Sequence, residues 1–181
     1  CGAARIPQGE FSKRMTTEEP FDPLLSFAAV ERLVSKIYFR FSHLFLAQPE
    51  LRDFWWEMAK EEEQHACILQ ACRAVIENFT EQPLDPAINR DKAQQLSLRL
   101  NALLAQGTAA LTVEEAFRIA VDIESSEIDA IYSKLTHLGG EQIAKTMENL
   151  GVPASVQRQK LKAALRRFCA SPELLSAAER L

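Results

Sequence analysis

The sequence predicts an all-α protein, and three observations favour this class. Only 6 of the 181 residues are Gly and 8 are Pro, and the rest are rich in residues with high helix propensity. Several segments repeat apolar residues at the spacing of one face of an amphipathic helix. Capping and helix-breaking residues separate these segments. With 47% hydrophobic and 25% charged residues, the chain can form one domain with its own core.

The chain divides into an N-terminal arm and one helical domain. Residues 1–23 mix Gly, Pro, Ser, Thr and charge without periodicity, so we expect an arm there. The domain should occupy residues 24–181. Its first helix is expected from about Leu24 to Ala47, followed by a break at Gln48 and Pro49. Pro49 is well placed to open the second helix.

The second helix should run from Pro49 to about Phe79, and a long connection should follow. This connection, Thr80 to Ala110, contains two prolines and a run of leucines that predicts one short helix within it. Thr112 and Glu115 form a capping box, which opens a third long helix extending to Leu138.

The remainder of the chain is less regular. Gly139-Gly140 should end the third helix. Further helical segments are expected over Glu141–Leu150 and Ala154–Ala170, and a short C-terminal helix should follow Ser171-Pro172.

A carboxylate and an imidazole interrupt the apolar face of the second helix. Glu62 and His65 are three residues apart, so they lie on one face, one turn apart. Burying either group unpaired would cost on the order of several kcal/mol. A metal ion would compensate both groups, whereas a solvated charged turn is the simpler alternative.

The first and third helices also carry glutamates at mid-helix on apolar faces, namely Glu31 in the first and Glu124 with Glu127 in the third. In an antiparallel bundle these positions meet at one height, and the gathered carboxylates would repel one another unless cations balance them. Carboxylates with imidazole suit iron or manganese. Inward glutamates with Glu-x-x-His are typical of di-iron carboxylate bundles.

The spacing of these residues resembles that of a known family. The motifs are Glu31 with Tyr38 seven residues later, Glu62-x-x-His65, Glu124-x-x-Glu127, and Tyr132 eight residues after Glu124. Through them, the stretch from Phe27 to Tyr132 resembles the rubrerythrins of the ferritin-like di-iron carboxylate superfamily. Both tyrosines of the chain fall on tyrosine positions of that family.

The resemblance implies a fold and a site. The fold would be a ferritin-like antiparallel four-helix bundle with a long crossover between helices two and three, plus a short C-terminal helix. Iron, as one or two ions, would be the metal, with manganese or zinc as alternatives. The implied metal ligands are Glu31, Glu62, His65, Glu124 and Glu127. Tyr38 and Tyr132 would donate hydrogen bonds to ligand carboxylates.

The resemblance also implies an activity and partners. Peroxide reduction or ferrous iron oxidation by an iron-dependent oxidoreductase is expected of such a site. A homodimer and a separate electron-donor protein are the implied partners.

The fourth helix departs from the family pattern, which has a second Glu-x-x-His there. Counting without gaps from Tyr132 brings that motif to Gln157-Arg158-Gln159-Lys160, and residues 151–171 contain neither Glu nor His. The di-iron site is therefore expected to be incomplete. Two alternatives stay open. One is a non-catalytic interaction module whose core pairs Lys160 or Arg158 with Glu124 and Glu127, and the other is iron storage.

Charge and cysteine usage exclude other classes. A net charge of -4 without a basic stripe argues against nucleic acid, and no apolar run approaches the ~20 residues of a membrane span. The four cysteines form no Cys-x-x-Cys pair, which argues against a zinc ribbon. We expect Cys1, Cys67, Cys72 and Cys169 to be reduced thiols of a cytoplasmic protein.

Overall fold

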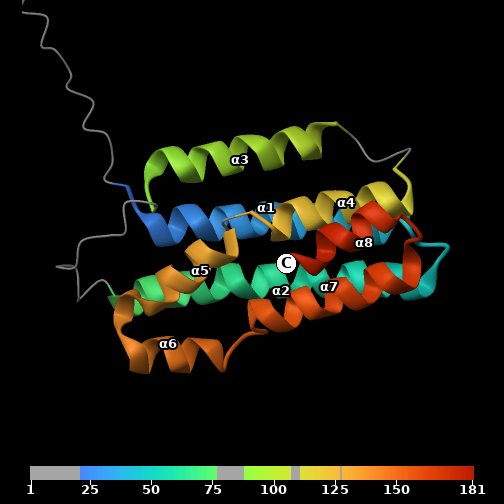
Figure 1. The fold of residues 1–181 in the computed structure, drawn as a ribbon. Coiled ribbons are helices and arrows are strands. Elements are labelled where there is room, and N and C mark those ends of the chain that lie inside the picture. The colour runs from blue at the N-terminus through green and yellow to red at the C-terminus, as the bar shows by residue number, and fades with distance from the viewer. Residues whose placement is uncertain (1–20, 77–87, 107–110, 127) are drawn as a thin grey trace, which may run out of the picture.

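A computed structural model describes residues 21–76, 88–106, 111–126 and 128–181. Within these ranges the chain forms eight α-helices and one 3-10 turn, with no β-strand (Figure 1). The predicted all-α class is therefore confirmed. Residues 1–20 of the predicted arm lie outside the described ranges.

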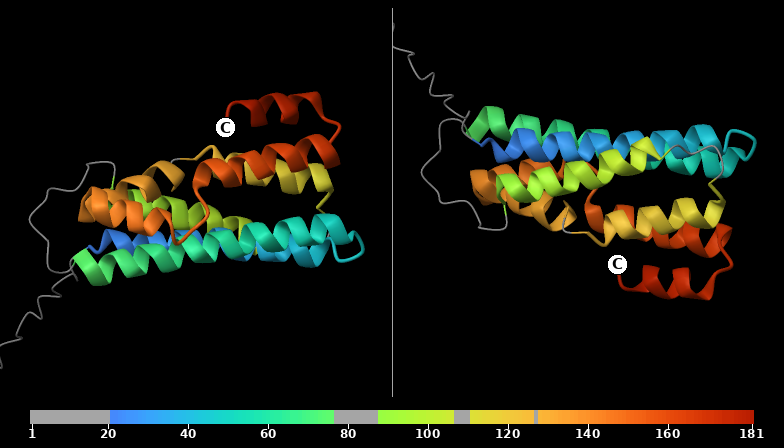
Figure 2. Two further views of the ribbon diagram at one scale, coloured as in Figure 1. Left: turned by 90° about the horizontal axis from the view of Figure 1, so that it is seen from below. Right: turned by 90° about the horizontal axis from the view of Figure 1, so that it is seen from above.

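Helices α1 (Pro23–Leu44) and α2 (Pro49–Ile76) pack side by side and run in opposite directions (Figures 1 and 2). A side-chain oxygen of Asp22 accepts a hydrogen bond from the backbone of Leu25 at 3.0 Å, which caps the start of α1. The predicted extension of this helix to Ala47 was wrong, since α1 ends at Leu44. Pro49 opens α2 as predicted, and residues 77–87 fall outside the described ranges.

The predicted helix within the long connection is confirmed as α3 (Arg90–Ala105), which packs on α1 (Figure 1). The side chain of Asn89 caps it by accepting a hydrogen bond from the backbone of Lys92 at 2.8 Å. Its length of 16 residues exceeds the short helix that the leucine run predicted.

The third long helix was predicted to be continuous, and this was wrong. The capping box of Thr112 and Glu115 opens α4 (Val113–Glu124), but the helix stops at Glu124. The chain resumes as α5 (Ile128–Thr136) and the 3-10 turn η1 (His137–Gly139). Two serines, Ser125 and Ser126, follow Glu124. Their hydroxyls bond to nearby backbone groups, which competes with the helical hydrogen bonds.

The C-terminal part contains α6 (Glu141–Glu148), α7 (Ala154–Phe168) and α8 (Pro172–Glu179), close to the predicted segments. Helix α7 packs against α2 and α4, and α8 packs against α7 and α4 (Figure 2). Ser171 caps α8 as predicted.

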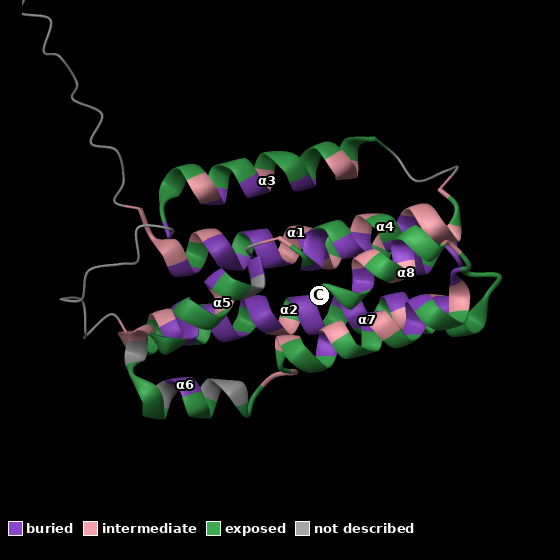
Figure 3. Ribbon diagram, in the orientation of Figure 1, coloured by how far each residue is buried: buried purple, intermediate pink, exposed green. Residues whose placement is uncertain are grey.

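The core lies between these helices, where buried residues line the facing sides of α1 and α2 (Figure 3). Trp55 is fully buried and contacts Phe41, Phe54 and Phe117, with ring centroids 5.0, 4.8 and 4.8 Å away. This aromatic cluster fixes α2 against α1 and α4, two turns before Glu62 on the same helix.

None of the described helices is both long enough and apolar enough to span a bilayer.

The burial of two cysteines predicts a pattern of thiol labelling. Burial raises the pKa of Cys72 and of Cys169 from 9.0 to about 11, whereas Cys67 is exposed. Iodoacetamide at about pH 8 should therefore alkylate Cys67 in the folded chain and spare the two buried thiols, which are both enclosed and protonated. Peptide mass spectrometry measures this site by site.

The matched control is the same reaction in guanidinium chloride, where Cys72 and Cys169 should react as readily as Cys67. Rapid labelling of Cys72 or Cys169 without denaturant would contradict the packing of α2 or α7.

Candidate metal centre

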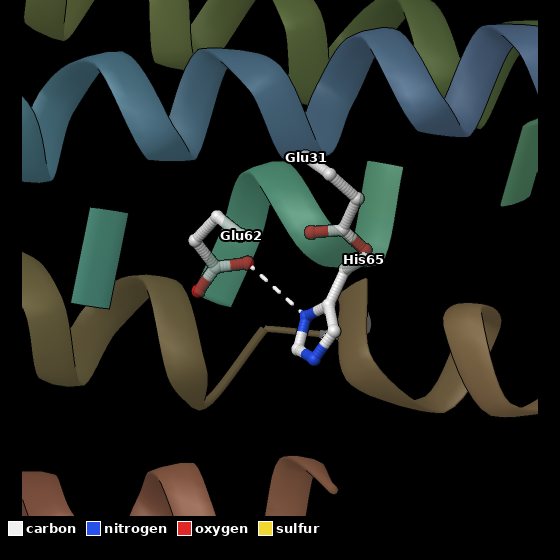
Figure 4. A group of neighbouring side chains, drawn as sticks. All are labelled: Glu31, Glu62 and His65. Atoms are coloured by element: carbon white, nitrogen blue, oxygen red, sulfur yellow. Dashed lines mark ion pairs between the residues drawn. The ribbon is translucent and has the colours of Figure 1, made fainter. Parts of the chain in front are cut away.

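Three of the predicted ligands meet between α1 and α2. Glu31, Glu62 and His65 each offer one ligand atom, and these atoms all lie within 4.8 Å of one another. The side chains point toward one another, Glu31 from α1 and the other two from α2 (Figure 4). All three are buried, with exposed fractions of 2%, 4% and 1%. The structure thus gathers two carboxylates and an imidazole away from solvent.

The surrounding sequence places these groups at one height. Glu62 and His65 lie on the buried face of α2, between Met58 and Leu69, which are both in the core. The hydroxyl of Ser35 on α1 donates a hydrogen bond to the carbonyl oxygen of Ala59 at 2.8 Å. This bond joins the two helices about one turn away from the cluster.

His65 is oriented by a backbone carbonyl. Its Nε2 lies 2.9 Å from the carbonyl oxygen of Val152, and because a carbonyl can only accept, Nε2 carries the proton. The other ring nitrogen, Nδ1, lies 3.4 Å from Oε2 of Glu62. Tyr132 packs on the imidazole, with ring centroids 4.5 Å apart. Nδ1 therefore faces the carboxylates, where it can bind either a proton or a metal ion.

The segment that supplies this carbonyl is held closely against α2. The side-chain amide of Gln64 donates to the carbonyl oxygen of Leu150 at 2.6 Å. Gly151 comes so near that a Cβ atom there would lie 2.5 Å from Cδ1 of Ile68. The glycine thus lets the backbone approach α2, and the approach brings the Val152 carbonyl within reach of His65.

Glu124 does not join the three-residue group, although it is also buried. Its Oε1 accepts a hydrogen bond from the hydroxyl of Tyr38 at 2.7 Å, across α1 and α4. Glu127, the fifth predicted ligand, lies outside the described residues. The assignment of Glu124 and Glu127 as ligands stays a prediction.

The fourth-helix motif position is occupied by Gln157, which contacts the centre directly. Gln157 lies in the first turns of α7, is fully buried, and donates from Nε2 to Oε1 of Glu62 at 2.5 Å. From the sequence, Gln157 was expected only to stand where the family has a glutamate ligand, with no role of its own. The ungapped count from Tyr132 was the signal that pointed to this position.

Lys160 forms an ion pair with Oε1 of Glu61. One alternative from the sequence paired Lys160 with Glu124 and Glu127 instead. The other alternative, a solvated charged turn around Glu62, does not describe Glu61, which is buried. Helix α2 packs against α1 on one side and against α7 on another. The buried face of α2 is therefore wider than its single apolar stripe and includes Glu61.

Comparisons with protein-family models, with curated proteins and with solved structures found no match to this chain. The resemblance to rubrerythrins therefore stays a prediction.

The three gathered side chains fit a divalent transition-metal ion. Carboxylate oxygens and an imidazole nitrogen are ligands for iron, manganese and zinc. Two carboxylates carry two negative charges, which a divalent ion balances in a site that excludes water. The proton on His65 Nε2 leaves Nδ1 as the atom directed toward such an ion.

The contact between Tyr38 and Glu124 predicts an energetic coupling between α1 and α4. Tyr38→Phe removes the hydroxyl donor to a buried carboxylate, so the free energy of unfolding should fall by about 1.5–3 kcal/mol. In a double-mutant cycle with Glu124→Ala, which removes the accepting oxygen, the coupling measured by urea unfolding should be at least about 1 kcal/mol.

The matched control replaces Glu124→Ala with Asp122→Ala, a substitution of an exposed acidic residue of the same helix. That cycle should be additive. Additivity in the Glu124 cycle as well would contradict the hydrogen bond.

Proposed function

We propose that this chain is a metal-binding protein with a ferritin-like, rubrerythrin-type bundle that holds one ion, with iron as the first choice. The ligands are Glu31, Glu62 and His65. The observation that carries the proposal is the convergence of three buried ligand atoms within 4.8 Å of one another.

The helix arrangement supports the ferritin-like part of the proposal. Helices α1, α2 and α7, with α4 and α5 together as the third, would be the four helices of the bundle. Helix α3 lies in the connection between the second and third of these, as a crossover connection would require. The break after Glu124 and the added helices α6 and α8 would be features of this chain.

Two observations favour one ion rather than two. Gln157 presents a neutral amide where a carboxylate would add a charged ligand. Glu124 is not one of the three residues whose ligand atoms converge within 4.8 Å. Glu124 and Glu127 would supply carboxylates to a second ion, but no second histidine follows in α7.

An iron ion at this site would supply redox chemistry with peroxide or oxygen. The chain's own residues bind the ion, orient the imidazole through the Val152 carbonyl, and keep water away. Peroxide reduction or ferrous iron oxidation is the activity class that we propose. A separate electron-donor protein and a homodimeric assembly belong to the same proposal.

A metal-free interaction module is the second candidate, and specific contacts favour it. Glu62 already accepts a hydrogen bond from Gln157 and pairs with His65, while Lys160 pairs with Glu61. These contacts would allow a folded bundle without any ion.

Reconstitution with ferrous iron under anaerobic conditions, followed by desalting and elemental analysis, tests the two candidates. The wild-type chain should retain about one iron per chain, because three ligands converge on one point. Glu62→Ala and His65→Ala each remove one of these ligands, so they should retain almost none.

Glu63→Gln is the matched control. Glu63 is the next residue on α2, loses the same charge, and is exposed beside Arg32, so iron retention should not change. Almost no iron in the wild-type chain, with its helical circular dichroism intact, would support the metal-free module instead. About two ions per chain would indicate a second metal site, for which Glu124 and Glu127 are the predicted ligands.

A further inference from the structure

The carboxamide nitrogen of Gln157 has a hydrogen-bond partner, whereas its oxygen has none among the described residues. Its Nε2 donates to Oε1 of Glu62 at 2.5 Å. Its Oε1 is buried, and no group of the described residues donates a hydrogen bond to it. The residue itself has an exposed fraction of 0%.

A buried amide oxygen without a donor is uncommon, because it loses its bonds to water on folding and gains nothing in return. Binding of an ion is one of the recognised roles of such an atom. The neighbour of this amide is Glu62, one of the three side chains that converge at the centre. The carboxamide that carries the unpartnered oxygen is therefore hydrogen-bonded to a residue of the proposed metal site.

We propose that Gln157 is a fourth ligand of the metal ion and binds it through Oε1. This inference rests on the proposed function. It assigns to one ion a ligand set of two carboxylates, one imidazole and one neutral carboxamide oxygen, contributed by α1, α2 and α7.

Rotation of the carboxamide accounts for both states of the site. A turn of about 180° about the last side-chain torsion exchanges the positions of Oε1 and Nε2 and requires no backbone movement. Without metal, the Glu62 carboxylate attracts the N–H end of the amide, as observed. With a metal ion bound to Glu62, the positive charge would favour the oxygen end of the amide, so Oε1 would turn toward the ion.

The placement of α7 makes such a ligand available. Gln157 lies close after the segment whose Val152 carbonyl orients His65, so the same turn of chain positions both groups. Lys160, one turn further along α7, pairs with Glu61, which neutralises a carboxylate adjacent to the site. The carboxylates left to bind the ion are then Glu31 and Glu62, which together carry two negative charges.

Cobalt(II) tests the inference because its visible absorption bands report the number and type of its ligands. The full chain is titrated with Co²⁺, and Gln157→Met is compared with Gln159→Met, an exposed glutamine of the same helix. In Gln157→Met the Co²⁺ bands should shift and the affinity should fall by about tenfold or more, since one ligand is lost. Gln159→Met should match the wild type in both measurements.

The outcomes separate this inference from the proposed function. Co²⁺ binding by Gln157→Met with unchanged bands would overturn the ligand assignment, whatever its affinity, and would leave the three-residue site intact. No Co²⁺ binding by the wild-type chain would overturn both. Should Gln157→Met fail to fold, Gln157→Glu serves as the second variant. It keeps an oxygen ligand, so weaker Co²⁺ binding than wild type would overturn the inference.

Discussion

The hydrogen bond from His65 Nε2 to the carbonyl oxygen of Val152 is the constraint on which the centre depends. It fixes the tautomer of the imidazole, so that Nδ1 faces Glu62. It also joins α2 to the segment before α7, which Gly151 and the Leu150 carbonyl bring close to α2. The position of Gln157 follows, because α7 begins directly after this segment. One bond thus links ligand orientation to helix packing.

The buried carboxylates are held by donors from other helices. Glu62 on α2 accepts from Gln157 on α7, Glu61 on α2 pairs with Lys160 on α7, and Glu124 on α4 accepts from Tyr38 on α1. Each contact crosses between two helices. Removing the donor to a buried carboxylate costs about 1.5–3 kcal/mol, so these contacts favour one relative placement of the helices. The aromatic cluster around Trp55 supplies the apolar packing beside them.

Sequence reasoning reached much of the fold because its signals are local. The Thr112–Glu115 capping box and the Ser171 cap depend only on neighbouring residues. The three-residue spacing of Glu62 and His65 placed both on the same buried face. The break after Glu124 was missed because the apolar pattern continues through it, while the serine hydroxyls bond to the backbone instead. The burial of Glu61 and the amide contact of Gln157 depend on how α7 packs against α2, which no local pattern specifies.

The measurement that tests the central claim most directly is anomalous X-ray diffraction from crystals of the zinc-loaded chain. The account predicts one strong anomalous peak between α1 and α2, with an oxygen of Glu31, an oxygen of Glu62 and Nδ1 of His65 each about 2.0–2.2 Å away. Zinc found only at surface carboxylates, with His65 Nδ1 still paired to Glu62 alone, would contradict it.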